Sequence, residues 1–219
     1  MKHILCFGDS NTWGYDTDTY DVTLGTVKRM PFEMRWPGIL QKSLGPKYRI
    51  IENALNGRTI MHDDPYFPHR NGRHSLEETL DANSPLDLVI IQLGVNELKQ
   101  MFNLTAGMIS YGMEKLIKIA LTSYNNYPVP KVLLIAPHPV SKEIVDGRLG
   151  FSYGSLAYSK SLELADLYKK VAERCSCAFL DCGQLNFSLN TLDGFHYSRQ
   201  DHEKLAGEVK DIVIEIIPT

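Results

Sequence analysis

Four short polar segments contain the residue types that could carry out chemistry on a small molecule. They are Gly8-Asp9-Ser10-Asn11, Asn56-Gly57-Arg58, Gly94-Val95-Asn96-Glu97 and Asp193-Gly194-Phe195-His196. A serine hydroxyl becomes a nucleophile when an imidazole takes its proton, and a carboxylate can hold that imidazole in the right tautomer. Ser10, His196 and Asp193 are therefore the candidate catalytic residues, since Asp193 precedes His196 by three positions.

Short apolar runs alternate with amphipathic helical patterns along the chain. The apolar runs, typical of strands buried on both faces, are Lys2–Phe7, Arg49–Ala54, Leu86–Leu93, Lys131–Ala136 and Ala178–Leu180. The helical patterns are Arg35–Leu44, Thr105–Tyr124, Tyr158–Ala172 and Ser198–Ile216, the last with Ser198 and Asp201 spaced as a capping box. This alternation predicts one three-layer α/β/α domain over residues 1–219, with a flavodoxin-like five-stranded parallel sheet of order 2-1-3-4-5.

In this topology the first strand lies between the second and the third, and their carboxyl ends meet at one edge. Ser10 follows the first strand, Gly57 the second and Asn96 the third. The Gly57 amide and the Asn96 side chain could then donate hydrogen bonds beside the Ser10 hydroxyl, as an oxyanion hole requires. Simpler roles are a turn residue for Ser10, a positive-φ turn for Gly57 and a cap for Asn96.

In their order and spacing, the four segments resemble those of the SGNH (GDSL-type) hydrolases. The resemblance extends over nearly the whole chain and is closest to the subgroup of arylesterase/acyltransferase and acetyl-esterase enzymes. Further counterparts of that subgroup are Thr12-Trp13-Gly14, Arg35-Trp36, Arg58-Thr59 and Asp63-Asp64-Pro65. Two positions depart from the family pattern, because Asn11 stands where Leu is frequent and Glu97 where Asp is usual. The change at Glu97 concerns the hydrogen bonding that holds the Asn96 loop.

The resemblance implies a serine esterase for short-chain acyl esters, above all acetyl esters, of small alcohols, aryl alcohols or sugars. Acyl transfer to an alcohol is a further implied activity. His196 would take the proton of Ser10, while the Ser10 and Gly57 amides and the Asn96 side chain would form the oxyanion hole. No cofactor is implied. Members of the subgroup assemble into oligomers, so we expect a homo-oligomer with contacts in the three long loops, Tyr15–Pro31, His62–Ser75 and Pro137–Ser155.

Other polar and aromatic residues have weaker claims to a role. Trp13 and His138 follow closely on Ser10 and on the fourth strand, so each could line the pocket, or be a core aromatic and a surface histidine. His202 is expected on the polar face of the last helix. A cluster of possible metal ligands lies in one Pro-rich loop without helical His-x3-His spacing, so no metal site is predicted. Its members are His62, Asp63, Asp64, His69 and His74.

Composition sets further limits on function. Of the 219 residues 43% are hydrophobic and 22% charged, a globular mixture, and the net charge of −3 argues against broad binding to nucleic acid or acidic membranes. No apolar run approaches the ~20 residues of a membrane helix, and no secretory signal is present, so we expect a cytoplasmic protein acting on a small-molecule ester. The four cysteines lack zinc-site spacing and are interpreted as ordinary buried thiols.

Two other functions are compatible with the same scaffold. A non-catalytic carbohydrate- or lipid-binding domain would have no need of Ser10, Asp193 and His196 together, and a serine-reactive organophosphonate would then fail to label Ser10. A flavodoxin-like nucleotide binder would need a phosphate-binding loop. The sequence has neither G-x-G-x-x-G nor G-x4-G-K-[ST], which argues against this second alternative.

Overall fold

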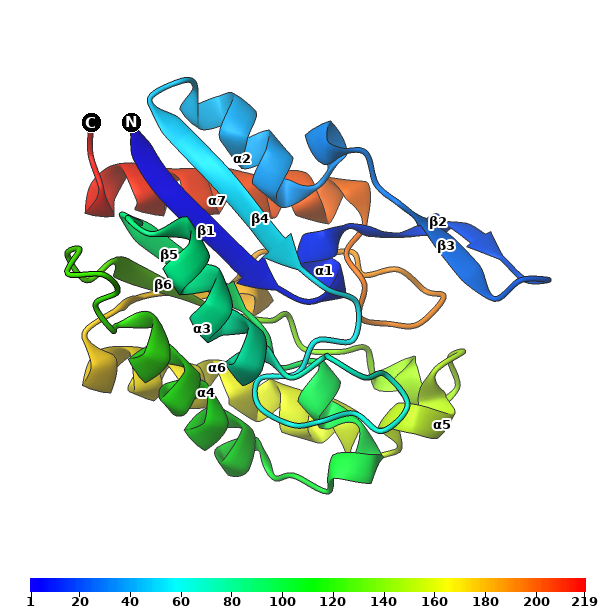
Figure 1. Cartoon of the computed structure of the whole chain (residues 1–219). Coiled ribbons are helices and arrows are strands. Elements are labelled where there is room, and N and C mark those ends of the chain that lie inside the picture. Colours follow the sequence, from blue (N-terminus) through cyan, green and yellow to red (C-terminus); the bar gives the residue numbers. More distant parts are fainter.

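A five-stranded parallel sheet runs through the centre of the computed structural model, which describes residues 1–219 (Figure 1). Its strands are β1 (Lys2–Gly8), β4 (Tyr48–Ala54), β5 (Leu88–Gln92), β6 (Lys131–Ala136) and β7 (Ala178–Asp181). The order across the sheet is β4-β1-β5-β6-β7, and every neighbouring pair is parallel. The predicted fold class and strand order are therefore confirmed.

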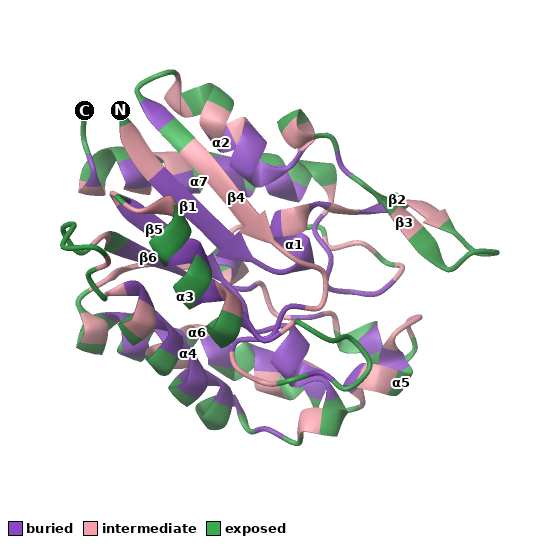
Figure 2. Cartoon of the chain, viewed as in Figure 1, coloured by how far each residue is buried: buried purple, intermediate pink, exposed green.

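Helices cover both faces of this sheet (Figure 1). One face carries α2 (Trp36–Leu44) and α7 (Arg199–Ile216), and the other carries α3 (Gly72–Asn83), α4 (Ala106–Ala120) and α6 (Ala157–Cys175). Alternate side chains of β1 enter opposite cores, because Ile4 and Cys6 pack toward α2 and α7 while Leu5 and Phe7 pack toward the other layer. The central strands are buried on both faces (Figure 2), which explains their continuous apolar runs.

Several short helices and turns lie in the loops that connect the strands and the longer helices. Four-residue helices are α1 (Ser10–Trp13) and α5 (Gly150–Tyr153), and 3-10 turns are η1 (Phe32–Met34), η2 (Asn96–Leu98), η3 (Gln100–Phe102), η4 (Lys142–Val145) and η5 (Cys182–Gln184). A hairpin of β2 (Tyr15–Asp21) and β3 (Thr26–Arg29) projects from the layered body (Figure 1), and its tip is exposed (Figure 2).

The β2–β3 hairpin and α3 were not predicted, nor were the short elements η4 and α5, which lie inside the segment expected to be a loop from Pro137 to Ser155. The segment expected to be a long loop from Tyr15 to Pro31 forms the β2–β3 hairpin, whose Asp- and Thr-rich strands lack an apolar pattern because most of the ribbon packs on no core. The loop expected to extend to Ser75 ends earlier, at the start of α3. That helix buries only Gly72, Leu76, Thr79 and Leu80, so its apolar stripe is too narrow to give a helical signal.

The start of α7 shows one confirmed and one wrong prediction. The capping box is confirmed, since the Ser198 side chain accepts from Asp201 N–H and the Asp201 carboxylate accepts from Ser198 N–H. The expectation that His202 lies on a polar face is wrong, because the residue is 1% exposed and its Nδ1 accepts a hydrogen bond from Trp36 N–H at 3.2 Å. Burial lowers the pKa of His202 to about 3, so a neutral ring joins α7 to α2.

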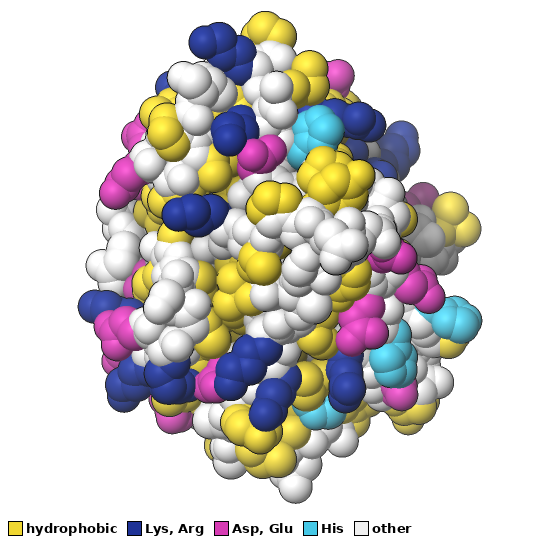
Figure 3. Space-filling model, turned by 60° about the vertical axis from the view of Figure 1, so that its left-hand side comes forward, with side chains coloured by type: hydrophobic (Ala, Val, Ile, Leu, Met, Phe, Trp, Pro, Cys, Tyr) yellow, Lys and Arg dark blue, Asp and Glu magenta, His cyan; other side chains and the backbone are white.

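The surface of the molecule carries side chains of both charges. Acidic and basic side chains are interspersed on the face shown in Figure 3. None of the helices combines the length and the apolar character needed to cross a membrane. All four cysteines are free thiols, with Cys6 and Cys182 buried and Cys175 and Cys177 half-buried.

Candidate active site

Ser10, His196 and Asp193 form one hydrogen-bonded row at the carboxyl edge of the sheet. Ser10 Oγ lies 2.8 Å from His196 Nε2, and His196 Nδ1 lies 2.7 Å from Asp193 Oδ2. The three residues are 6%, 3% and 1% exposed. The hydroxyl therefore has a direct path for its proton to an imidazole whose orientation is set by a carboxylate, an arrangement capable of nucleophilic catalysis.

The carboxylate of Asp193 is held in its ionised form. Burial alone would raise its pKa, but the facing His196 and the hydrogen bonds it receives outweigh burial and hold the pKa below the ordinary 3.8. Backbone N–H groups of His196 and Phe195 donate to Oδ1 at 3.2 and 3.4 Å. Since Oδ1 is engaged by its own loop, Oδ2 is fixed toward the imidazole.

The turn that carries Ser10 depends on the two residues before it. A Cβ at Gly8 would lie 2.1 Å from Thr12 Oγ1, so this position accommodates only glycine. Asp9 caps α1, because its side chain accepts from Asn11 N–H at 2.9 Å. Burial raises the pKa of Asp9 to about 6. Asp9 thus supports the nucleophile turn.

Asn11 ties the turn of Ser10 to the loop of His196. Its Nδ2 donates to Phe195 O at 3.1 Å, and its Oδ1 accepts from Tyr197 N–H at 3.0 Å. Both neighbours of His196 are therefore bound by one side chain. Sequence reasoning noted Asn11 only as a departure from Leu, although an amide is the group that can donate and accept at once.

A second chain of buried hydrogen bonds links the same two segments through β5. Thr12 Oγ1 donates to Gln92 Oε1 at 2.9 Å, and Gln92 Nε2 donates to Tyr197 OH at 3.0 Å. That hydroxyl also accepts from His138 N–H at 3.3 Å. Two separate sets of hydrogen bonds, one through Asn11 and one through Gln92, thus fix the segment of Ser10 relative to that of His196.

Three N–H donors, on Ser10 itself and on the loops of Gly57 and Asn96, have hydrogens that nothing in the chain accepts. The backbone N–H groups of Ser10 and Gly57 have no acceptor, and Asn96 Nδ2 uses one of its two hydrogens on Arg58 O at 3.0 Å. Gly57 has φ +77°, the left-handed region that favours glycine. Unused donors on loops from three neighbouring strands are what a developing oxyanion needs.

Arg58 holds these loops at fixed distances. Its Nη1 donates to Gly8 O at 3.1 Å and to Asn53 O at 2.7 Å, and its carbonyl accepts from Asn96. Burial lowers its pKa to about 10, so the guanidinium remains charged at neutral pH. The side chain connects the ends of β1 and β4, and the carbonyl adds the loop after β5, so one residue joins the three loops that carry the candidate oxyanion donors.

Glu97 anchors the turn that presents Asn96. Its Oε1 accepts from Ile60 N–H, its Oε2 has no partner, and the residue is 0% exposed. Burial raises its pKa to about 8, so the carboxyl group keeps its proton at neutral pH. The longer Glu side chain, in place of the usual Asp, thus reaches from η2 to the segment that follows β4.

Tyr15 covers one face of the His196 ring. The two ring centroids are 4.0 Å apart and the planes are inclined by 11°. Sequence reasoning did not single out Tyr15, because it placed this residue at the start of a loop. Its position directly after Trp13-Gly14 was the available signal, since the chain must leave the nucleophile turn there.

Trp13 and His138, the two residues that could line a pocket, both make aromatic contacts. Trp13 packs against Arg29, whose guanidinium carbon is 5.0 Å from the indole centroid and whose Nε donates to Trp13 O at 2.8 Å. His138 stacks on Phe187 and lines a hollow of about 480 Å³ that reaches Asp193 but not Ser10.

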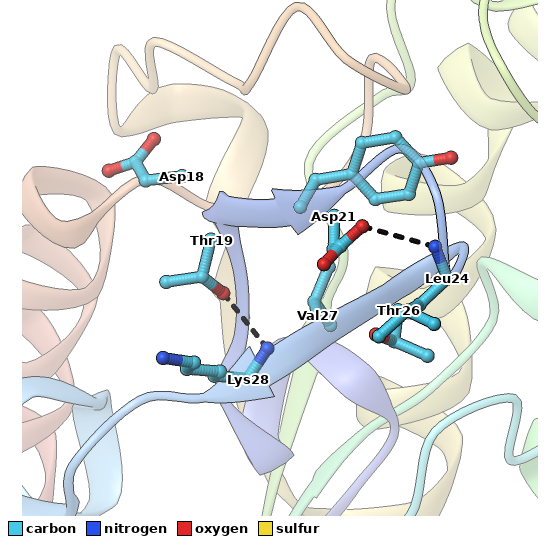
Figure 4. A pocket seen from close by; sticks show the side chains of 8 residues that line it. Asp18, Thr19, Asp21, Leu24, Thr26, Val27 and Lys28 are labelled. Carbon is cyan, nitrogen blue, oxygen red and sulfur yellow. Dashed lines mark hydrogen bonds between the residues drawn. The ribbon is translucent and has the colours of Figure 1, made fainter.

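A larger hollow of about 600 Å³ lies on the hairpin. Asp18 and Thr19 of β2 and Lys28 of β3 are among the residues that line it (Figure 4). Neither hollow is lined by Ser10, Gly57 or Asn96.

The two carboxylates among the residues considered as metal ligands are engaged in other contacts. Asn71 Nδ2 donates to Asp63 at 3.1 Å, and Lys99 Nζ donates to Asp64 at 2.8 Å. Across residues 1–219 no three His, Cys, Asp or Glu side chains are grouped as metal ligands would be.

A parallel α/β sheet with a Ser-His-Asp row at its carboxyl edge defines the class of α/β hydrolytic enzymes. The profile of the GDSL-like lipase/acylhydrolase family matches residues 6–204. The chain belongs to this family, and it is a carboxylic ester hydrolase. A comparison with curated protein sequences found no significant match.

Solved structures similar to the chain carry related descriptions. An aryl esterase from M. smegmatis is 33% identical, with a TM-score of 0.91 over 99% of this chain and 100% of that one. A carbohydrate acetylesterase from Sinorhizobium meliloti is 36% identical, with a TM-score of 0.89 and the same coverage. A putative arylesterase from Agrobacterium tumefaciens is 35% identical, with a TM-score of 0.86, again over 99% and 100%.

Replacement of Glu97 by Gln should flatten the pH dependence of stability. The folded chain keeps the Glu97 proton up to about pH 8, whereas an ordinary Glu loses it near 4.5, so the free energy of unfolding falls as pH rises between these values. This contribution is about 1.4 kcal/mol per pH unit. Urea unfolding from pH 5.5 to 7 measures it, with the exposed Glu208→Gln variant as control. An unchanged slope in Glu97→Gln would contradict the assignment.

Proposed function

We propose that the chain hydrolyses short-chain acyl esters, acetyl esters above all, with Ser10 as the nucleophile. The observation that carries this proposal is the buried row from Ser10 Oγ through the His196 ring to Asp193 Oδ2. Similarity to structures described as aryl esterases and carbohydrate acetylesterases supports aryl or sugar alcohols as the second half of the ester.

The proposed mechanism has two steps, the transfer of the acyl group to Ser10 and its release to water, and His196 moves the proton in both. His196 Nε2 takes the Ser10 proton as Oγ attacks the ester carbonyl, and Asp193 stabilises the imidazolium that forms. The Ser10 and Gly57 N–H groups and the free Asn96 N–H bind the oxyanion. His196 then protonates the leaving alcohol. Water attacks the acyl-serine by the same route, and another alcohol in its place would give acyl transfer.

The preference for a small acyl group is supported by the similarity to a structure described as a carbohydrate acetylesterase and by the burial of the site residues. Ser10, Asn96 and His196 are all more than nine-tenths buried, and the two hollows described above lie away from the three candidate donors. A long acyl chain would need an apolar channel beside Ser10. We therefore expect acetate to be the best acyl group.

Hydrolysis of p-nitrophenyl esters with two to twelve carbons tests the nucleophile and the acyl size together. We expect the acetate to react fastest and Ser10→Ala to be inactive, with Ser155→Ala, a change at an exposed serine, keeping the wild-type rate. A maximum at long chains would overturn the acetyl preference in favour of a lipase-like activity. No turnover by the wild type would favour a binding domain.

Asn96→Ala should lower kcat by about 10²–10³, the usual loss for one oxyanion donor. Asn96→Asp should lose a comparable factor, because a carboxylate keeps the shape of the side chain but cannot donate. Steady-state kinetics with p-nitrophenyl acetate measures both effects, and far-UV circular dichroism checks the fold. A folded Asn96→Ala enzyme with wild-type kcat would remove Asn96 from the mechanism.

We also propose a homo-oligomer with contacts in the three long loops named from the sequence. Each of them exposes large apolar side chains, for example Val22, Tyr66 and Phe151 at 81%, 78% and 79%. Paired copies would cover such residues. Light scattering at micromolar concentration should give a multiple of the 24.8 kDa chain mass, and a monomer mass would contradict the proposal.

A further inference from the structure

Arg148, in the turn between η4 and α5, is a cation without a carboxylate partner beside the site. Its Nη2 donates to Tyr15 OH at 2.8 Å, and its guanidinium carbon lies 4.7 Å from the Tyr20 ring centroid. No Asp or Glu oxygen approaches it within 4.0 Å, whereas Arg29, Arg35, Arg174 and Arg199 all have such partners. The positive charge of Arg148 is therefore not neutralised within the chain.

Tyr15 connects this cation to the candidate general base. The phenol ring stacks on the His196 ring with centroids 4.0 Å apart, and its hydroxyl accepts from Arg148. In the proposed mechanism His196 Nε2 gives its proton to the leaving oxygen, so the alcohol portion of the ester must lie beside this ring. Arg148 is thus placed on the alcohol side of the site, one phenol ring away from His196.

Part of the guanidinium is free to bind a ligand. Nη1 has no hydrogen-bond partner and is not buried, while Nε is buried and also has no partner. A ligand oxygen can therefore reach the guanidinium at Nη1, next to the Nη2 that donates to Tyr15. Contacts with Tyr15 and Tyr20 fix the plane of the group, and a fixed planar fork suits the two oxygens of a carboxylate.

Acidic side chains on the surrounding elements are already engaged. Asp193 pairs with His196, Asp16 accepts from Arg199 Nη2 at 3.1 Å, and Glu143 accepts from the Ser141 hydroxyl. Asp146, two residues before Arg148, does not come within 4.0 Å of its guanidinium. None of these carboxylates therefore forms an ion pair with the Arg148 guanidinium.

We infer that Arg148 selects esters whose alcohol portion carries a carboxylate, such as acylated hydroxy acids or acidic sugars. The inference rests on the proposed function, because it requires the alcohol to leave beside His196. It adds a preference for a charged alcohol portion to the proposed esterase activity.

The test compares charged and neutral esters of the same shape. Substrates are 3- and 4-acetoxybenzoate and the corresponding acetoxybenzamides, and the readout is the ratio of kcat/KM for benzoate over benzamide. We expect Arg148→Gln to lower this ratio about tenfold, mainly through KM, the loss typical of one charge-assisted hydrogen bond. Arg148→Lys should keep part of the ratio, because it keeps the charge without the planar fork.

Lys142→Gln is the matched control, since it removes one charge from an exposed residue of the same loop and should leave the ratio unchanged. Any disturbance of Tyr15 by the Arg148 variants affects both substrates and cancels in the ratio. A ratio in Arg148→Gln within twofold of the wild type would overturn the inference while leaving the esterase intact. Absence of wild-type turnover on p-nitrophenyl acetate and on all four esters would instead overturn the proposed function.

Discussion

The geometry of the site depends on one buried side chain that joins two distant parts of the sequence. Asn11 bonds to the backbone on both sides of His196, and the residue before Asn11 is Ser10. Without this bridge the loop of His196 would lose its direct side-chain link to the nucleophile turn, and the longer link through Gln92 and Tyr197 would remain. Because the amide both donates and accepts, the loop of His196 is fixed in position and in rotation.

The rest of the carboxyl edge extends the same principle of paired buried polar groups. Gln92 connects Thr12 to Tyr197, and Arg58 connects the ends of three strands. Such groups are costly to bury unless they are bonded, so each of them favours one arrangement of the loops. The unpaired N–H groups of Ser10 and Gly57 and the second Asn96 N–H are the donors that the proposed mechanism assigns to the reacting ester.

Strong apolar periodicity allowed the sheet, its order and four helices to be predicted from the sequence. The pairing of Asp193 with His196 followed from local spacing, and the approach of Ser10 to them followed from the topology of parallel sheets. The roles of Asn11 and Tyr15 were missed, because contacts between residues about 180 positions apart leave no local pattern in the sequence. The hairpin and α3 were missed because they bury too little apolar surface to show a period.

In the proposed mechanism Ser10 is an activated nucleophile because Asn11 holds His196 against it. The most direct measurement is the rate at which a serine-reactive organophosphonate labels the protein, with the labelled residue identified by mass spectrometry. We expect one adduct, on Ser10, that forms rapidly in the wild type and much more slowly in a folded Asn11→Ala variant. Absence of label on Ser10 in the wild type, or equal rates in the two proteins, would contradict this mechanism.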